Sequence, residues 1–287
     1  LTNSTSNNLD QIVSLLINNE KFDPEESRIS YAFYLSTGKI AKQLISVKSV
    51  DINYKYVIIV NSSPNYESPL TSAIRKNDIE KIDLIIQCPT FDKFKSRIIA
   101  AIFIATSLED TSIFKKLLTL IDNDVNILSA NYQTLFFWVV HENLIDYVTL
   151  ILSYDTFDSK KSDILGAFLF SFRCDLSITK KIYEYDQEHD HLIDLTKLLP
   201  SGKSFLTSIT LCNDDLIDFL IKNGANPNEP DLFGIYPLEY AILTENGVLA
   251  SALINSDKID YSARLSVDDL NNFADLRNNS LRCSSSK

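Results

Sequence analysis

The chain has 287 residues, of which 38 are Asp or Glu and 27 are Lys or Arg, so its formal net charge is −11. This acidic balance argues against a nucleic-acid binder and against docking on an anionic membrane surface, because both depend on basic side chains. The length alone suggests about two domains of roughly 150 residues, and an apolar content of 45% indicates a folded chain.

The cysteines are far apart in the sequence and form no CxxC pair, which favours a reducing compartment over a disulfide framework or a zinc site. They are Cys88, Cys174, Cys212 and Cys283. The longest apolar stretch, residues 98–105, is far shorter than the ~20 residues of a membrane span. We therefore expect a cytoplasmic protein with no membrane insertion. Methionine is absent even at position 1, which indicates a fragment or a processed product.

Short helical patterns follow one another from the N-terminus. We expect a half-repeat helix at residues 9–18 and two helices at 30–36 and 39–46. Pro69 and Leu70 then open a helix behind Ser68, a residue type that caps helix N-termini. Its partner has Ile79, Ile82 and later isoleucines at three-to-four spacing.

A sequence motif recurs three times along the chain. Residues 84–96 and 150–162 share Thr-Phe-Asp and a later Ser at an offset of 66, and residues 15–27 hold an earlier copy at an offset of 69. We interpret 66 as twice a unit of about 33 residues. Two helices this short are marginal alone and leave an apolar face that only a neighbouring unit can bury. The pattern therefore predicts a solenoid.

The stretch from Asn223 to Ala241, NGANPNEPDLFGIYPLEYA, resembles the ankyrin repeat family, with Tyr236 in place of the usual Thr. Asp51-Ile-Asn53 and Asp124-Val-Asn126 repeat its D-x-N turn. The resemblance implies an all-α ankyrin-type solenoid of about seven helix-turn-helix repeats with short hairpin loops. The leucines of its T-P-L motif correspond to Leu70, Ile102, Phe136, Leu206 and Leu238.

In this register the array spans residues 1–264, with a divergent unit at 163–197. A capping helix and a tail would occupy residues 265–287. The connection from Asn53 to Leu70 is 17 residues rather than 10, which predicts a seven-residue insertion in that finger. The family's T-P-L-H histidine is missing. Asparagine replaces several inter-helix glycines, at Asn77, Asn143 and Asn213, because it tolerates the left-handed conformation.

Patterns that carry chemistry are incomplete. Pro200-Ser-Gly-Lys-Ser204 resembles the end of a P-loop, but position 197 is Lys where glycine is needed. His189-Asp-His191 lies among carboxylates and is interpreted as a solvated acidic loop, with adventitious metal binding as the alternative. Trp138 is expected in the core. We expect no catalytic residue, no metal site and no cofactor.

The resemblance implies a concave groove formed by hairpin fingers and inner helices. Besides Asn65, Glu67 and Asn131, the groove-facing positions are Arg75, Lys76, Gln133, His141, Glu142, Leu232, Phe233 and Ile235. Exposed apolar side chains at fingertips would be anchors for binding, although Leu232 and Phe233 could instead pack on neighbouring turns. A second candidate is the long finger, with Tyr54, Tyr56 and Tyr66.

The sequence therefore predicts a non-catalytic interaction module, a monomer whose groove binds a protein partner of unknown identity. A partner with a basic patch would suit the acidic net charge. The alternative is the targeting or substrate-recruiting arm of a larger enzyme whose catalytic domain lies outside this chain.

Overall fold

A computed structural model describes residues 11–21, 23, 28–47, 49–60, 63–209, 213–256 and 258–260. Residues 11–17 are helical, within the helix expected at 9–18. The expected capping helix and tail at 265–287 lie outside the described residues.

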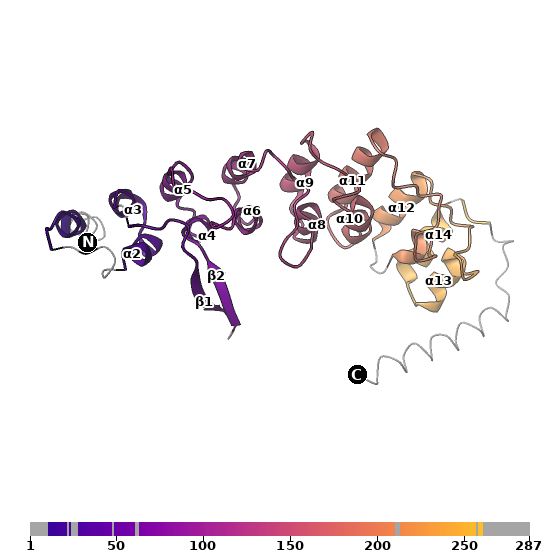
Figure 1. The fold of residues 1–287 in the computed structure, drawn as a ribbon. Helices are drawn as coiled ribbons and strands as arrows, with labels where there is room; N and C mark the ends of the chain where they lie inside the picture. Colours follow the sequence, from indigo (N-terminus) through magenta and orange to yellow (C-terminus); the bar gives the residue numbers. More distant parts are fainter. Residues whose placement is uncertain are drawn as a thin grey trace. The chain divides into compact units, whose positions relative to one another are not determined.

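The described residues form seven consecutive pairs of short helices, shown in chain order in Figure 1. The pairs are α2 (Ile29–Leu35) with α3 (Gly38–Leu44), α4 (Pro69–Arg75) with α5 (Ile79–Ile86), α6 (Ile98–Ala105) with α7 (Ser112–Thr119), α8 (Leu135–His141) with α9 (Ile145–Leu152), α10 (Ile164–Ser171) with α11 (Leu176–Glu188), the single 3₁₀ turn η1 (Leu206–Ser208) with α12 (Asp214–Lys222), and α13 (Pro237–Leu243) with α14 (Gly247–Asn255). The predicted fold class, an all-α ankyrin-type solenoid, is confirmed.

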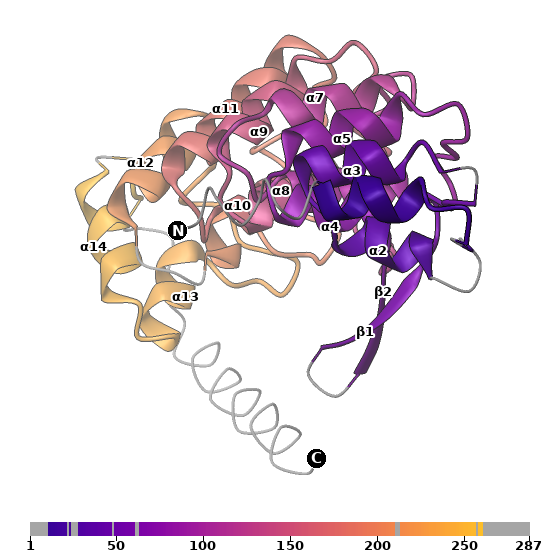
Figure 2. The same cartoon turned by 90° about the vertical axis from the view of Figure 1, so that its left-hand side faces the viewer.

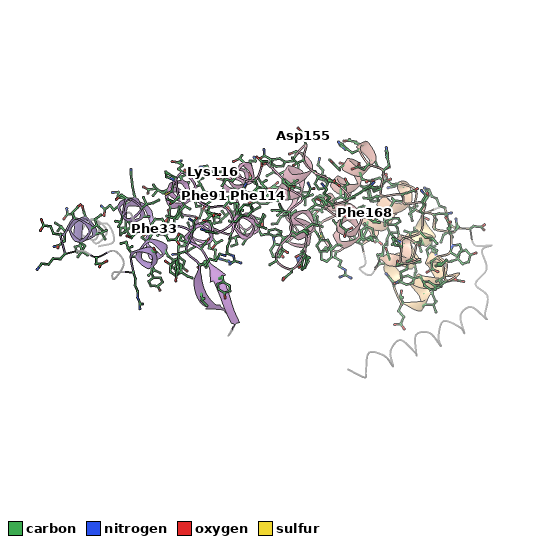
Figure 3. All side chains as sticks on the ribbon, viewed as in Figure 1. Phe33, Phe91, Phe114, Lys116, Asp155 and Phe168 are labelled. Atoms are coloured by element: carbon green, nitrogen blue, oxygen red, sulfur yellow. The ribbon has the colours of Figure 1, made fainter. Side chains whose placement is uncertain are left out.

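The chain divides into two compact units, Leu1–Val139 with Asp146–Ser162 and Val140–Ile145 with Asp163–Lys287. In the first unit α4 contacts α2 and α6, while α5 contacts α3, so first helices pack on first helices and second on second (Figures 1 and 2). Phe33 and Phe114, labelled in Figure 3, are fully buried in this unit. In the second unit η1 contacts α13, α12 contacts α14, and Phe168 is fully buried. Each unit thus has its own apolar core.

The predicted insertion after Asn53 forms a β-hairpin. Strand β1 (Tyr56–Val60) pairs antiparallel with β2 (Ser63–Glu67), from Tyr56 opposite Glu67 to Val60 opposite Ser63. The hairpin extends away from α4 in both views of the ribbon (Figures 1 and 2). Ser68 follows directly and caps α4, as predicted, with its side chain accepting from the Thr71 N–H.

Asparagine side chains link consecutive helix pairs. Asn53 Nδ2 donates to Thr90 O at 2.8 Å, and Asn53 Oδ1 accepts from the Asp92 N–H at 2.9 Å. Asn126 and Asn228 repeat this bridge, respectively with Thr156 O and Asp158 N, and with Lys258 O and Asp260 N. The D-x-N turn of one pair therefore binds the turn that opens the next pair. These bonds join neighbouring turns along the chain.

Copies of the recurring motif precede the first, third and fifth helix pairs, as Lys-Phe-Asp at residues 21–23 and as Thr-Phe-Asp at 90–92 and 156–158. The residues before α2, α6 and α10 are Arg28, Arg97 and Asp163, and all three have a positive φ, of 48°, 61° and 53°. These helices begin at residues 29, 98 and 164. Their starts are therefore separated by 69 and 66 residues, the same offsets that separate the copies of the motif. The motif therefore repeats once every two helix pairs. Each helix pair corresponds to one unit of about 33 residues.

The predicted asparagine substitutions divide into two kinds. Asn77 and Asn143 have φ values of 51° and 58°, as expected for replacements of an inter-helix glycine. For Asn213 the prediction is wrong, because its φ is −145° and its side chain accepts from the Leu216 N–H. A helix N-cap needs extended backbone rather than the left-handed conformation.

Candidate interaction surface

Three of the predicted groove residues, Glu67, Arg75 and Lys76, lie beside a group of tyrosines at the base of the hairpin. Arg75 at the end of α4 pairs with Glu67 of β2, with 3.2 Å between Arg75 Nε and Glu67 Oε1. Glu67 is itself buried and accepts a hydrogen bond from Tyr34 Oη. Lys76 Nζ lies 6.0 Å from the centre of the Tyr34 ring, within the range of a cation–π contact.

Four tyrosines pack against one another here, and we call them the tyrosine platform: Tyr31, Tyr34, Tyr54 and Tyr56. The centroid of the Tyr56 ring lies 4.3 Å from that of Tyr34, 4.6 Å from Tyr54 and 5.3 Å from Tyr31. Tyr34 is buried and supports the others, whereas Tyr31 and Tyr54 are 46% and 49% exposed. The platform thus presents aromatic surface already held in place by ring-to-ring packing.

Two of the platform phenols, those of Tyr34 and Tyr56, are uncharged at neutral pH. Burial, with the neighbouring Glu67 carboxylate, raises the pKa of Tyr34 to about 12. Burial also raises the pKa of Tyr56 above its ordinary value. A partner would meet aromatic rings next to two basic side chains, Arg75 and Lys76.

A buried lysine supports the platform from beneath. Lys81 of α5 donates from Nζ to three carbonyl oxygens at the end of α2: Phe33 O at 2.6 Å, Tyr34 O at 2.9 Å and Ser36 O at 2.6 Å. The carbonyls at a helix C-terminus lack intrahelical partners, so a cation placed there satisfies them. Burial and the like charge of Lys76 lower the pKa of Lys81 to about 8. In the sequence Lys81 looks like one of many surface lysines on an amphipathic helix, so its buried position could not be predicted.

Three hairpin fingers share one five-residue geometry. The first residue's N–H donates to the fifth residue's carbonyl at 2.8–2.9 Å in residues 129–133, 199–203 and 231–235. The fourth residue has a positive φ in each: Tyr132 at 60°, Gly202 at 81° and Gly234 at 80°. Tyr132 is also 85% exposed. A bulky residue in the left-handed conformation is an outlier, and the sequence analysis missed it. The T-P-L register could have found it, since it aligns Tyr132 with Gly234.

The fingertip trio of the last repeat is only partly exposed. Leu232 and Phe233 are 73% and 64% exposed, as expected of an anchor, although the Leu232 side chain also lies close to Gly202. Ile235 is buried at 8%, so the expectation that it is exposed is wrong. The reason lies in the turn: Asp231 Oδ1 accepts from the N–H groups of Phe233 and Ile235, and the chain bends inward at its fifth residue.

The remaining predicted groove residues, Gln133, His141 and Glu142, are placed by local contacts. Gln133 closes the 129–133 finger through its backbone. His141 Nδ1 lies 2.9 Å from Glu142 Oε1, and its ring stacks on Phe170 with 5.0 Å between ring centres. Glu142 and His141 are both exposed. A partner-binding role for these three residues stays a prediction.

The His189–His191 segment closes the end of α11. Both carboxylate oxygens of the fully buried Asp186 accept from the backbone N–H groups of Leu192 and Ile193, at 2.9 and 2.8 Å. The His189 ring stacks on Tyr185 with 4.1 Å between ring centres. Among the described residues, no group of three His, Cys, Asp or Glu side chains is arranged to hold a metal ion.

The residues that resemble a P-loop also have structural roles. Gly202 lies in the 199–203 finger, and Ser204 Oγ accepts from the Thr207 N–H at the start of η1. Trp138 is half-buried rather than fully in the core, and its Nε1–H donates to Thr106 Oγ1 at 3.1 Å.

Comparison with known proteins finds similarity among solved structures. No family model matches the chain, and no curated protein matches it. Among solved structures, the crystal structure of EF0377, an ankyrin repeat protein, is similar over 79% of this chain and 96% of its own, at 15% identity and a TM-score of 0.38. The fold class assigned above rests on the helix pairs themselves. Within the described ranges, no helix combines the length and the apolar character that crossing a bilayer requires.

Proposed function

We propose that the chain is a non-catalytic interaction module that binds a protein partner. The observation that carries this proposal is the tyrosine platform with Arg75 beside it. Tyrosine and arginine are enriched among the residues that dominate binding energy at protein interfaces. Rings already fixed by their neighbours lose little conformational entropy when a partner covers them.

The platform residues come from separate segments that the fold brings together. Tyr31 and Tyr34 lie on α2, Tyr54 and Tyr56 at the start of the hairpin, and Arg75 at the end of α4. Such a surface needs two adjacent repeats and the insertion. Further contacts are proposed at the exposed fingertip of Leu232 and Phe233, and at Lys76, Gln133, His141 and Glu142.

The two faces of the hairpin allow a matched experiment. Tyr56 pairs with Glu67 and Val57 with Tyr66, so Tyr66 lies on the opposite face of the sheet from Tyr56. Partners would be captured from native lysate with the wild-type chain, with the double variant Tyr31→Ala and Tyr54→Ala, and with Tyr66→Ala.

We expect the double variant to lose about tenfold or more of the captured partner, and Tyr66→Ala to retain it. Equal capture by all three chains would refute the platform as the binding surface. Circular dichroism of each variant establishes that it is folded. The second candidate function, the targeting or substrate-recruiting arm of a larger enzyme, would place a catalytic domain in the same open reading frame, outside these 287 residues.

A further inference from the structure

The outer edge of strand β1 is not used by the tyrosine platform. Within the described part of the chain β1 pairs with β2 alone, in a two-stranded sheet. The hairpin extends beyond α4 in both ribbon views (Figures 1 and 2). A strand at the edge of a sheet presents unpaired N–H and C=O groups to any strand that approaches.

Pro64 decides which backbone groups face outward. Proline has no N–H, so the opposed pair Ile59 and Pro64 cannot exchange both ladder bonds. The hydrogen-bonded pairs are then the three that alternate with it: Tyr56 with Glu67, Ile58 with Asn65, and Val60 with Ser63. The N–H and C=O groups of Val57 and Ile59 consequently point away from β2.

The two edges of the hairpin differ in how well they are protected against pairing with another strand. On β2 the outward positions include Pro64, which offers no donor and interrupts the edge. On β1 residues 56–60 read YVIIV, with neither proline nor charge. Natural sheet edges carry prolines or charges that prevent pairing with another chain. The β1 edge has neither device.

We propose that two copies of this chain associate through their β1 edges to form a four-stranded antiparallel sheet. A two-fold axis at Ile58 would set Val57 of each copy opposite Ile59 of the other. Four backbone hydrogen bonds would then cross the interface, because both residues direct both groups outward.

The residue types of β1 suit pairing with the same strand of a second copy. Four of its five residues are β-branched, the type that packs well in sheets, and no like charges would face each other within it. A two-stranded sheet is marginal in water and gains from further strands. The net charge of −11 opposes association only weakly, since salt screens charges beyond about 8 Å. The proposal replaces the expectation of a monomer.

Sedimentation velocity of the full chain, from low micromolar to several hundred micromolar, tests the proposal. We expect a dimer that Ile59→Pro weakens by about tenfold or more, because this change removes an outward donor where the hairpin already tolerates Pro64 opposite. Ile59→Ala is the matched control, since it keeps the N–H and should retain most of the association. Circular dichroism checks that both variants are folded.

Amide hydrogen exchange provides a second readout. The N–H groups of Val57 and Ile59 should exchange more slowly as concentration rises. The N–H of Ile58, bonded to β2 in either state, should not change. The proposal is overturned if the wild-type chain stays monomeric at every concentration, even if it binds an added extended peptide along β1. It is also overturned if the chain forms a dimer that Ile59→Pro does not affect. The partner surface uses the ring faces of Tyr31 and Tyr54, so either result leaves the proposed function standing.

Discussion

Tyr132 combines a backbone conformation that suits glycine with the exposed position of a contact residue. The equivalent positions of the other two described fingers are Gly202 and Gly234. An L-residue in the left-handed conformation costs roughly 1–2 kcal/mol. Strain of this kind persists where the side chain has a use, and an exposed ring at a fingertip is suited to binding.

Replacing Tyr132 by glycine should therefore stabilise the protein while removing a contact residue. We expect Tyr132→Gly to raise the free energy of unfolding by about 0.5–1 kcal/mol, the steric gain being partly offset by the greater freedom of glycine in the unfolded chain. Urea denaturation measures the difference. The adjacent Asn131 has no positive φ, so Asn131→Gly should lower stability instead. A loss of stability in both variants would contradict the strain argument.

At the scale of elements, Lys81 joins α5 to the end of α2. Its ammonium group is buried and donates to three backbone carbonyl oxygens. Such a group stabilises the junction between two repeats through charge-assisted hydrogen bonds, but its burial disfavours the charged form. Stability at this junction should consequently depend on pH.

The folded chain releases the Lys81 proton near pH 8, and the unfolded chain near the ordinary pKa of 10.5. Between these values the unfolded chain binds more protons, so the free energy of unfolding rises with pH, by at most about 1.4 kcal/mol per pH unit. The raised pKa of Tyr34 gives the opposite trend only above pH 10. Unfolding measured between pH 8 and 10 should show the rise in wild type, and a smaller rise in Lys76→Met, which removes the like charge but keeps the burial of Lys81.

Lys81→Met should lose this rise and be less stable throughout the range by about 2–3 kcal/mol, because the carbonyls lose a charged donor. Identical pH profiles for wild type and Lys81→Met would show that the buried amine does not titrate in this range.

For the whole molecule, the two compact units should unfold separately, because each has its own core. Trp138 is the single tryptophan of the chain and lies in the first unit, so its fluorescence reports on that unit alone. Phe114 belongs to the first unit and Phe168 to the second, and both are fully buried.

Phe114→Ala should destabilise the first unit by about 3–5 kcal/mol and lower the midpoint of the fluorescence transition. Phe168→Ala should leave that midpoint in place and lower part of the transition followed by circular dichroism. If both variants moved the fluorescence midpoint equally, the molecule would unfold as one cooperative array.

Local patterns in the sequence were enough to predict the helix pairs. The spacing of Ile79, Ile82 and Ile85, the cap at Ser68 and the extra length after Asn53 each concern residues close together in the chain. Helix periodicity, capping and turn formation act over that range. The number of pairs and the finger insertion followed from these patterns together with the ankyrin resemblance. The resemblance also implied the fingertip of Leu232 and Phe233, but left their exposure as one of two alternatives.

Contacts between residues distant in the sequence were decided only by the tertiary structure. The D-x-N and Thr-Phe-Asp motifs were both visible in the sequence. The hydrogen bonds between Asn53 and residues Thr90 and Asp92 could not be predicted from them. Lys81 beneath α2, the gathering of the tyrosine platform and the burial of Ile235 likewise depend on how neighbouring repeats and turns pack. Residue type and spacing determine which elements form, whereas the partner of a polar or aromatic side chain depends on which surfaces the stacked repeats bring into contact.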